Sequence, residues 1–487
     1  MRKRFEAQLS IGSIPISEVK IPTKTRDEFP PFLRAMQYIY CTPELNEKIY
    51  QLLEGIICKG KKQTGRPGMN LWELFVLAGT RLCLNTNYDR LHHTANYDTL
   101  LRQILGVYEP IVGGKVYEYQ NIIDNVKLLD DETLKQINDI IVEAGHGLIK
   151  KKETEALRLK TDTYVIESNI HFPTDINLLW DSGRKCIDVT GYFISQEGGV
   201  IDGWRKAKNW KKVLKKKMRS LSKICSAGGI NKEDKVKNAA KDYLETAKAL
   251  SKKVNNFIES YPMETEGDLL SLIKLSYFLE MLAKHIDLIY RRLIKDEKIP
   301  AQDKIYSVFE TYTEWIMKGK FRPNVELGKK LLVTTDQYHF IVDYQVIENQ
   351  ADVETIIPLV ERLIKRYVVQ SLSGDKGFWN KETRELLALF IPEVIIPKKG
   401  KLNKEEKERE SQKTYKNLRN KHSGIESNIN QLEHNGLDRC PDRGLRGFKR
   451  YVGIGVIAYN LHRIGKYLLM KDKEILGKNR PKYKKAA

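Results

Sequence analysis

The order of strand-like and helical segments most strongly limits how this 487-residue chain can fold. The stretch ALRLKTDTYVIESNI, residues 156–170, alternates in the manner of a β-strand and is rich in β-branched residues. Residues 203–321 then show long helical runs without a strand pattern. After them, KKLLVTTDQYHFIVDYQVI predicts two strands around a turn near Gln337, and a helix, strand, helix, strand and long helix (about residues 404–433) follow.

This order predicts an α/β fold with several segments of distinct character. Residues 151–202 and 322–471 would form an RNase-H-like mixed-sheet core, interrupted by an all-helical insertion at 203–321. Residues 41–150 show short amphipathic helices with tight polar turns, and we expect them to form a helix-turn-helix-like DNA-binding region, although a plain helical bundle gives the same pattern. We expect an extended, proline-containing arm at residues 1–40 and a basic tail at 472–487.

The charge balance favours a polyanionic partner. Lys and Arg number 84 against 63 Asp and Glu, which gives a formal net charge of +21. Nucleic acid and an anionic membrane surface both fit this excess, as does a merely solubilising surface. Between Arg205 and Lys223 ten cations occur without an acid, and the same helix carries an apolar stripe. The candidate phosphate-binding side chains of this basic helix are Lys211, Lys212, Lys215 and Lys216.

A membrane or secretory destination is not indicated. Apolar runs stay below the roughly 18 residues that a bilayer span needs. The beginning MRKRFEAQLSIGS is basic but lacks the apolar centre of a signal peptide. The expected location is therefore the cytoplasm.

Three carboxylates are candidates for a metal-dependent reaction. Asp162 lies in the first core strand, Asp375 ends a strand that should lie beside it, and Glu426 is on a later helix. Carboxylates gathered in one cleft repel one another unless cations neutralise them, and oxygen ligands suit Mg²⁺ or Mn²⁺. Two such ions support phosphodiester displacement. Taken singly, each residue also fits an ordinary turn, cap or solvated position.

Asp336, in LLVTTDQYHFIVD, is the main rival of Asp375. It also follows an apolar strand, but the next strand runs back at once, so we expect its turn at the edge of the sheet. Asp375 instead follows a helical crossover from Asp352 to about Tyr367, which can return the chain to a strand parallel to the first.

Several motifs together resemble one family of proteins. They are GRPGMNLWELFVLAGTRL, TDTYVIESNIHFPTDINLLWD, GDKGFWNKETRELL, IPKKGKLNKEE and KHSGIESNINQLEHNGLDRCPDRGLRGFKRYVGIGVIAYNLHRIG. They resemble bacterial insertion-sequence transposases of the DDE type, and the ISNCY group most closely. The resemblance implies that Asp162, Asp375 and Glu426 are the catalytic, metal-binding triad. It also implies double-stranded DNA partners (element ends and target), a homodimer or larger assembly on DNA, and association with the nucleoid when bound.

The chain departs from that family pattern in two ways. In many relatives a large insertion lies between the second Asp and the Glu. Here only 51 residues separate Asp375 from Glu426, and the long insertion falls between Asp162 and Asp375 instead. Many relatives also carry Lys or Arg seven residues beyond the Glu, where this chain has Glu433. Phosphate contacts would then come from other cations, with Arg419, Lys421 and Arg439 as candidates. Trp379 could stack on an unpaired base or pack in the core.

Three functions remain compatible with these patterns. The first is a transposase that cuts element ends and joins the freed 3′ hydroxyl to target DNA. The second is a metal-dependent nuclease or resolvase on the same fold, which hydrolyses strands without joining them. The third is a catalytically silent DNA-binding descendant, against which the intact carboxylates argue.

Overall fold

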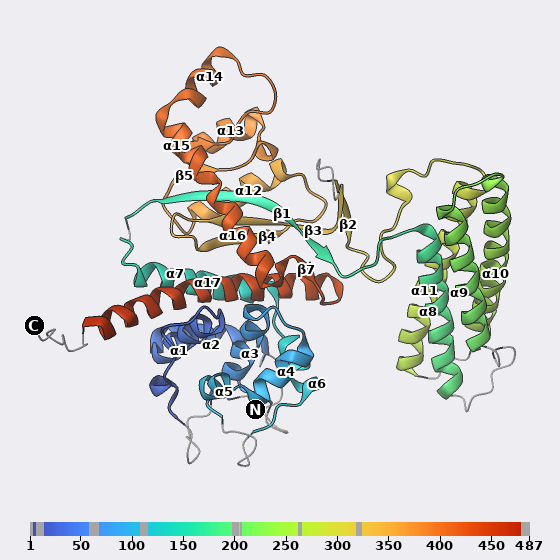
Figure 1. Cartoon of the computed structure of the whole chain (residues 1–487), viewed down its shortest axis with the longest axis horizontal. Helices are drawn as coiled ribbons and strands as arrows, with labels where there is room; N and C mark the ends of the chain where they lie inside the picture. Colours follow the sequence, from blue (N-terminus) through green and yellow to red (C-terminus); the bar gives the residue numbers. More distant parts are fainter. Residues whose placement is uncertain are drawn as a thin grey trace, which may run out of the picture. The chain divides into compact units, whose positions relative to one another are not determined.

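The computed structural model describes residues 3–5, 14–57, 68–107, 115–152, 154–196, 204, 207–261, 265–317 and 324–478. The chain divides into two compact units. The first combines Met1–Asn169 with Ile316–Ala487, and the second is Ile170–Trp315 (Figure 1).

A mixed sheet forms the centre of the first unit. Its strands are β1 (Leu157–Ser168), β2 (Glu314–Met317), β3 (Val325–Thr335), β4 (Ile341–Val346), β5 (Val369–Ser373), β6 (Glu393–Ile395) and the two-residue β7 (Arg439–Cys440). Along the sheet the order is β2-β3-β1-β5-β6, with β4 also paired to β3 and β7 to β1. β3 is antiparallel to both β1 and β4, whereas β5 is parallel to β1 and β6 is parallel to β5.

The connections between strands agree with the sequence prediction on most points. The predicted hairpin is β3 and β4, and the crossover helix α12 (Asp352–Ile364) returns the chain to β5 beside and parallel to β1, as expected. One expectation is wrong: β3, from which Asp336 follows, is not at the edge of the sheet but pairs directly with β1. The predicted long helix after β6 is also divided, because the backbone at Gln412 is extended (ψ 140°). The chain instead forms α14 (Lys404–Ser411), α15 (Lys413–His422) and α16 (Gly424–Leu432).

Helices from both ends of the chain complete the first unit. They are α1 (Phe29–Cys41), α2 (Pro43–Ile57), α3 (Leu71–Cys83), α4 (Tyr88–Tyr97), α5 (Thr99–Leu105), α6 (Tyr119–Val126), α7 (Asp131–Leu148), α13 (Lys381–Ala388) and α17 (Gly444–Lys478). Short 3₁₀ segments, η1 (Ile16–Glu18) and η4 (Lys376–Phe378), and a π-helical segment, η5 (Glu433–Leu437), connect them. In Figure 1, α7 and α17 run side by side between the sheet and α1–α6.

The N-terminal helices pack closely on the C-terminal helix. A Cβ atom on Gly465 of α17 would lie 1.6 Å from the carbonyl oxygen of Pro31, so only glycine allows α1 to approach this closely. The predicted extended arm at residues 1–40 therefore does not hold over its second half, because Phe29–Cys41 bury an apolar face as α1. Similarly, the predicted tail from Asp472 begins inside α17, where Asp472 pairs with Arg34 at 2.8 Å. Residues 479–487 lie outside the described residues.

The second unit is a bundle of four helices. They are α8 (Asp175–Gln196), α9 (Ala207–Ser226), α10 (Lys232–Ser260) and α11 (Glu266–Leu293), followed by the short η3 (Ala301–Asp303). Side chains of all four helices share one apolar core, to which α8 contributes Leu179 and Phe193. This unit therefore begins at Ile170, earlier than the predicted boundary at residue 203, because α8 buries its apolar face in the bundle rather than against the sheet.

Candidate active site

Asp162 lies on the central strand β1, between β3 and β5. Its Oδ1 accepts a hydrogen bond from the backbone N–H of Thr163 at 2.7 Å. Burial, together with the nearby negative charge of Asp375, raises the pKa of Asp162 to about 6. A carboxyl group that is partly shielded from water and faces a second carboxylate is the arrangement that a cation would relieve.

Asp375 reaches the same region from the parallel strand β5. Ser373 pairs with Lys160 across β1 and β5, and Asp375 and Asp162 each follow two residues later. The two residues therefore lie at a similar position along the direction of the strands. Asp375 is 67 % exposed and lies 3.3 Å from His422, measured from Oδ1 to Nε2. This interaction lowers the pKa of Asp375 below its ordinary value.

His422 links Asp375 to its own strand. It is the last residue of α15, and its Nδ1 lies 3.1 Å from the hydroxyl oxygen of Ser373 while its Nε2 faces Asp375. Contacts on both ring nitrogens restrict the orientation of the imidazole. In the sequence, His422 stands four residues before Glu426 and Ser373 two residues before Asp375, and neither was predicted as a site residue. A polar residue two positions before the predicted catalytic acid was the available signal.

Glu426 projects from the first turn of α16 and shares a pocket with Asp375. The pocket has a volume of about 360 Å³. Its lining includes Asp375, Arg419, His422 and Glu426. Asp162 is not among its lining residues, and within the described part of the chain no three His, Cys, Asp or Glu side chains are grouped closely enough to bind a metal ion. The structure thus places Glu426 beside Asp375, and Asp375 within electrostatic reach of Asp162.

Asp336 occupies a different kind of site. Its side chain is completely buried, and its Oδ2 lies 2.6 Å from Nε2 of His146 on α7. Its Oδ1 accepts hydrogen bonds from the backbone N–H groups of Tyr338 and Phe340, both at 2.9 Å. Every oxygen of Asp336 is engaged in holding the β3–β4 turn, which indicates a structural role.

The predicted DNA-contacting side chains lie in three separate places. Lys212 and Lys216 are exposed on α9, whereas Lys211 pairs with Asp188 at 2.7 Å and Lys215 lies 5.8 Å from the ring centre of Trp180. The start of the predicted basic helix, Arg205 and Lys206, lies outside the described residues.

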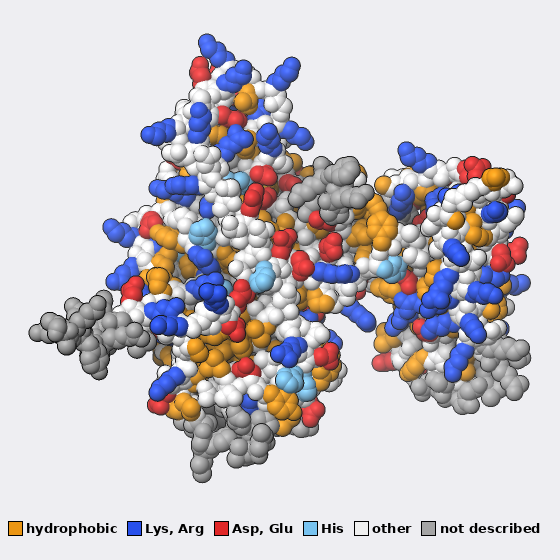
Figure 2. Space-filling model, in the orientation of Figure 1, with side chains coloured by type: hydrophobic (Ala, Val, Ile, Leu, Met, Phe, Trp, Pro, Cys, Tyr) orange, Lys and Arg blue, Asp and Glu red, His pale blue; other side chains and the backbone are white. Residues whose placement is uncertain are grey.

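The remaining candidates are close to the carboxylates or on β7. Arg419 lines the pocket and pairs with Glu410 at 3.6 Å, and Lys421 is exposed near the end of α15. Arg439 is exposed on β7. Trp379 is partly buried, 5.6 Å below the ammonium group of Lys398. Figure 2 shows many Lys and Arg side chains on the lobe formed by α13, α14 and α15.

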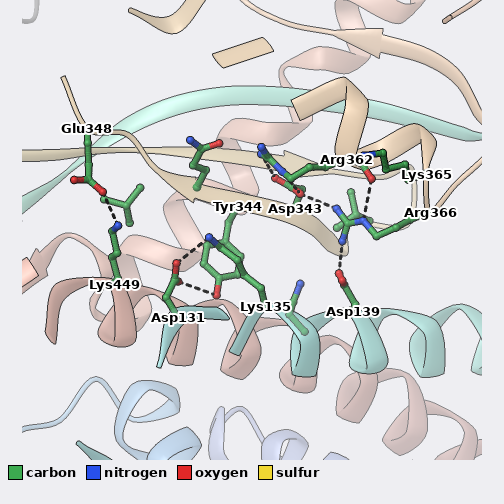
Figure 3. A pocket seen from close by; sticks show the side chains of 14 residues that line it. Asp131, Lys135, Asp139, Asp343, Tyr344, Glu348, Arg362, Lys365, Arg366 and Lys449 are labelled. Atoms are coloured by element: carbon green, nitrogen blue, oxygen red, sulfur yellow. Dashed lines mark hydrogen bonds and ion pairs between the residues drawn. The ribbon is translucent and has the colours of Figure 1, made fainter. Parts of the chain in front are cut away.

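A second pocket of the first unit, about 550 Å³ in volume, lies along β4, α7 and α12 (Figure 3). Asp343 at its wall is paired with both Arg362 and Arg366, and Arg366 also contacts Asp139. Lys449 pairs with Glu348 at the other end. These acids are matched by cations of the same pocket, so the geometry indicates an ion-pair network that connects α7, α12 and α17 to the sheet.

The DNA-binding prediction for residues 41–150 meets one clear restriction. Every residue of α3 is buried, so this helix cannot present side chains to a DNA groove. In α4, Arg90, His93 and Tyr97 are exposed and fall on one helical face.

None of the helices in the described ranges is both long and apolar enough to cross a bilayer.

Comparison with known proteins gives one match. No curated protein and no solved structure matches the chain. The family model described as the transposase DDE domain matches residues 302–461, a range that contains Asp375 and Glu426 and ends inside α17. Over residues 302–461, about a third of its length, the chain is therefore similar to the transposase DDE domain family.

Proposed function

We propose that the chain is a DDE transposase which cuts DNA at the ends of an insertion sequence and joins the freed 3′ hydroxyl to target DNA. The observation that carries this proposal is the placement of Asp162 on β1 and of Asp375 just beyond the end of the parallel strand β5, each two residues after the Lys160–Ser373 pair. The sheet supports an RNase-H-like core, because β1, β3 and β4 are joined by antiparallel pairs and β5 and β6 are added by parallel pairs. The family match over residues 302–461 supports the reaction class.

The side chains present fit divalent cations of the magnesium type. Asp162, Asp375 and Glu426 offer only carboxylate oxygens, which hard cations prefer. The raised pKa of Asp162 is consistent with a site that lacks compensating positive charge. These three residues would hold Mg²⁺ or Mn²⁺, with two ions as the expected number. Bound ions of this kind activate the attacking oxygen and stabilise the leaving oxygen in phosphodiester displacement.

The other residues of the pocket position the reacting groups. His422 and Ser373 orient the Asp375 carboxylate, which is otherwise largely exposed. Arg419 on α15 lines the same pocket as this carboxylate, Lys421 is exposed on the same helix, and both would contact the DNA backbone. Lys212 and Lys216 on the helical unit would add sequence-independent phosphate contacts. Two DNA ends processed together favour a dimer or larger assembly.

A strand-cleavage and strand-joining assay tests the proposal. The full chain is incubated with Mg²⁺, a supercoiled target plasmid and duplexes of the terminal DNA that flanks its coding region. We expect cut strands with 3′ hydroxyl ends and their covalent transfer into the plasmid. Cleavage without any joined product would favour the hydrolytic nuclease instead. No cleavage of any duplex, although the protein binds it, would favour the silent DNA-binding descendant.

A further inference from the structure

Lys160 occupies an unusual position beside the candidate active site. It lies two residues before Asp162 on β1, so the two side chains project from the same face of the sheet. The side chain is half-buried, and its ammonium nitrogen would lie only 3.0 Å from a Cβ atom placed on Gly424, the first residue of α16. Lys160 thus reaches from β1 to the beginning of the helix that carries Glu426.

The protein supplies little to stabilise this ammonium group. Within the part of the chain that the structure describes, the ammonium group of Lys160 makes no hydrogen bond or ion pair. Asp336 attracts it at a distance, but both oxygens of Asp336 are already bonded to His146 and to backbone N–H groups.

The two ends of α16 lie beside different residues of β1. Gly424 lies next to Lys160, and Glu433, just beyond the end of α16, acts electrostatically on Tyr164 of β1. Lys160, Asp162 and Tyr164 alternate along one face of β1, so Asp162 stands between the two ends of α16. An acid, Glu433, therefore follows the C-terminal end of α16, whereas Lys160 lies beside its N-terminal end.

We propose that Lys160 is a positioning residue that binds a DNA backbone phosphate next to the phosphate that is cut. The proposal rests on the proposed function, since it assigns the substrate contact of the same site. An incoming phosphate supplies the anion that the ammonium group lacks in the protein, and the contact fixes the strand relative to Asp162.

The test compares Lys160→Met, which keeps an unbranched apolar side chain without the charge, with Lys160→Arg and with Lys365→Met. Lys365 is an exposed lysine directly after the C-terminal end of α12. It serves as the control for the loss of one positive charge. Each protein is titrated, in chelator so that no strand is cut, against terminal duplexes in which single phosphates around the cut are replaced by neutral methylphosphonates.

Wild type should lose about fivefold to tenfold in affinity when one phosphate beside the cut is neutralised, as expected for a charged hydrogen bond. Lys160→Met should bind the unmodified duplex more weakly by a similar factor and be insensitive to neutralisation at that position. Its slope of log K against log salt should fall by about one. Lys160→Arg should restore the sensitivity, and Lys365→Met should behave like wild type.

Two results would overturn the proposal. One is a Lys160→Met protein with the same methylphosphonate profile as wild type, whatever its thermal stability, because a merely structural lysine leaves that profile unchanged. The other is a profile lost equally in Lys365→Met. Failure of the proposed function is a separate outcome: wild type would bind the duplex but cut no strand in Mg²⁺, while the phosphate scan would still report on Lys160.

Discussion

Asp162 lies on β1 and Asp375 just beyond the end of the parallel strand β5, each two residues after the register pair of Lys160 with Ser373. The two carboxylates come from positions 213 residues apart in the chain, and the whole helical unit is inserted between them. Burial and the negative charge of Asp375 together raise the pKa of Asp162, while His422 lowers the pKa of Asp375. This relationship leads to predictions that separate catalytic from structural carboxylates.

Asp375→Asn should abolish Mg²⁺-dependent cleavage and joining and leave DNA affinity within about twofold of wild type, since an exposed carboxylate adds little to phosphate binding. Asp336→Asn should keep most of its activity per folded molecule. It should nevertheless lower the free energy of unfolding by about 1–3 kcal/mol, because the charged hydrogen bond to His146 is weakened in a buried site. Single-turnover cleavage and urea unfolding measure the two effects. An essential Asp336 with a dispensable Asp375 would refute the assignment.

Asp162→Asn should make the metal-free protein more stable at neutral pH. The folded protein raises the pKa of Asp162 to about 6 from an ordinary value of 3.8, so it holds this proton more tightly than the unfolded chain does. The stability contributed by protonated Asp162 is complete below about pH 4 and is lost as the pH rises through about 6. Asn does not titrate, so the variant should exceed wild type by on the order of 2 kcal/mol above about pH 7, and the difference should disappear below about pH 4.

Urea unfolding in chelator between pH 4 and 8 measures this difference between wild type and Asp162→Asn. Added Mg²⁺ should then raise the stability of wild type more than that of the variant, because only wild type keeps the complete set of carboxylates. A wild type that is the more stable protein at pH 8 in chelator would contradict the raised pKa.

Replacing Lys211, Lys212, Lys215 and Lys216 together by Gln should weaken DNA binding and flatten its salt dependence. Lys212 and Lys216 should account for most of the change, because Lys211 is already paired with Asp188 and Lys215 lies over Trp180. The slope of log K against log salt should fall by about one for each phosphate contact that is lost. Gln at Lys241 and Lys252, exposed on α10, is the matched control. An unchanged slope in the fourfold variant would exclude this face from DNA binding.

Recognition of the element ends should depend on α4 rather than on the buried α3. Ala at Arg90 and Tyr97 should reduce the preference for terminal over scrambled duplexes by at least about tenfold, the discrimination expected from one good base contact. The whole chain must be used, because α1 and α3 bury their apolar faces against α17 and a fragment of residues 1–150 would expose them. Competition binding measures the ratio, and Lys127→Ala, at an exposed position after α6, is the control. An unaltered ratio would move end recognition elsewhere.

Periodicity and local capping in the sequence by themselves determined most elements of this protein. The alternating residues around Asp162 predicted β1, and the strand-like segments on both sides of Gln337 predicted the β3–β4 hairpin. The helical pattern that begins at Asp352 predicted the crossover helix α12. These signals are local, because strand alternation and helical spacing are set by neighbouring residues. The parallel return to β5 also followed from the sequence, since a helical crossover permits that geometry.

Only the tertiary structure decided which faces meet. Whether Phe29–Cys41 form an extended arm or a helix depends on α17, more than four hundred residues away, whose Gly465 admits Pro31 at close range. Whether α8 belongs to the sheet or to the inserted bundle depends on which apolar core its buried face joins. The ammonium of Lys160 meets Gly424, and the ring of His422 meets Ser373 and Asp375, through contacts between segments far apart in the chain. No local pattern encodes such contacts, because their energies depend on the packing of distant elements.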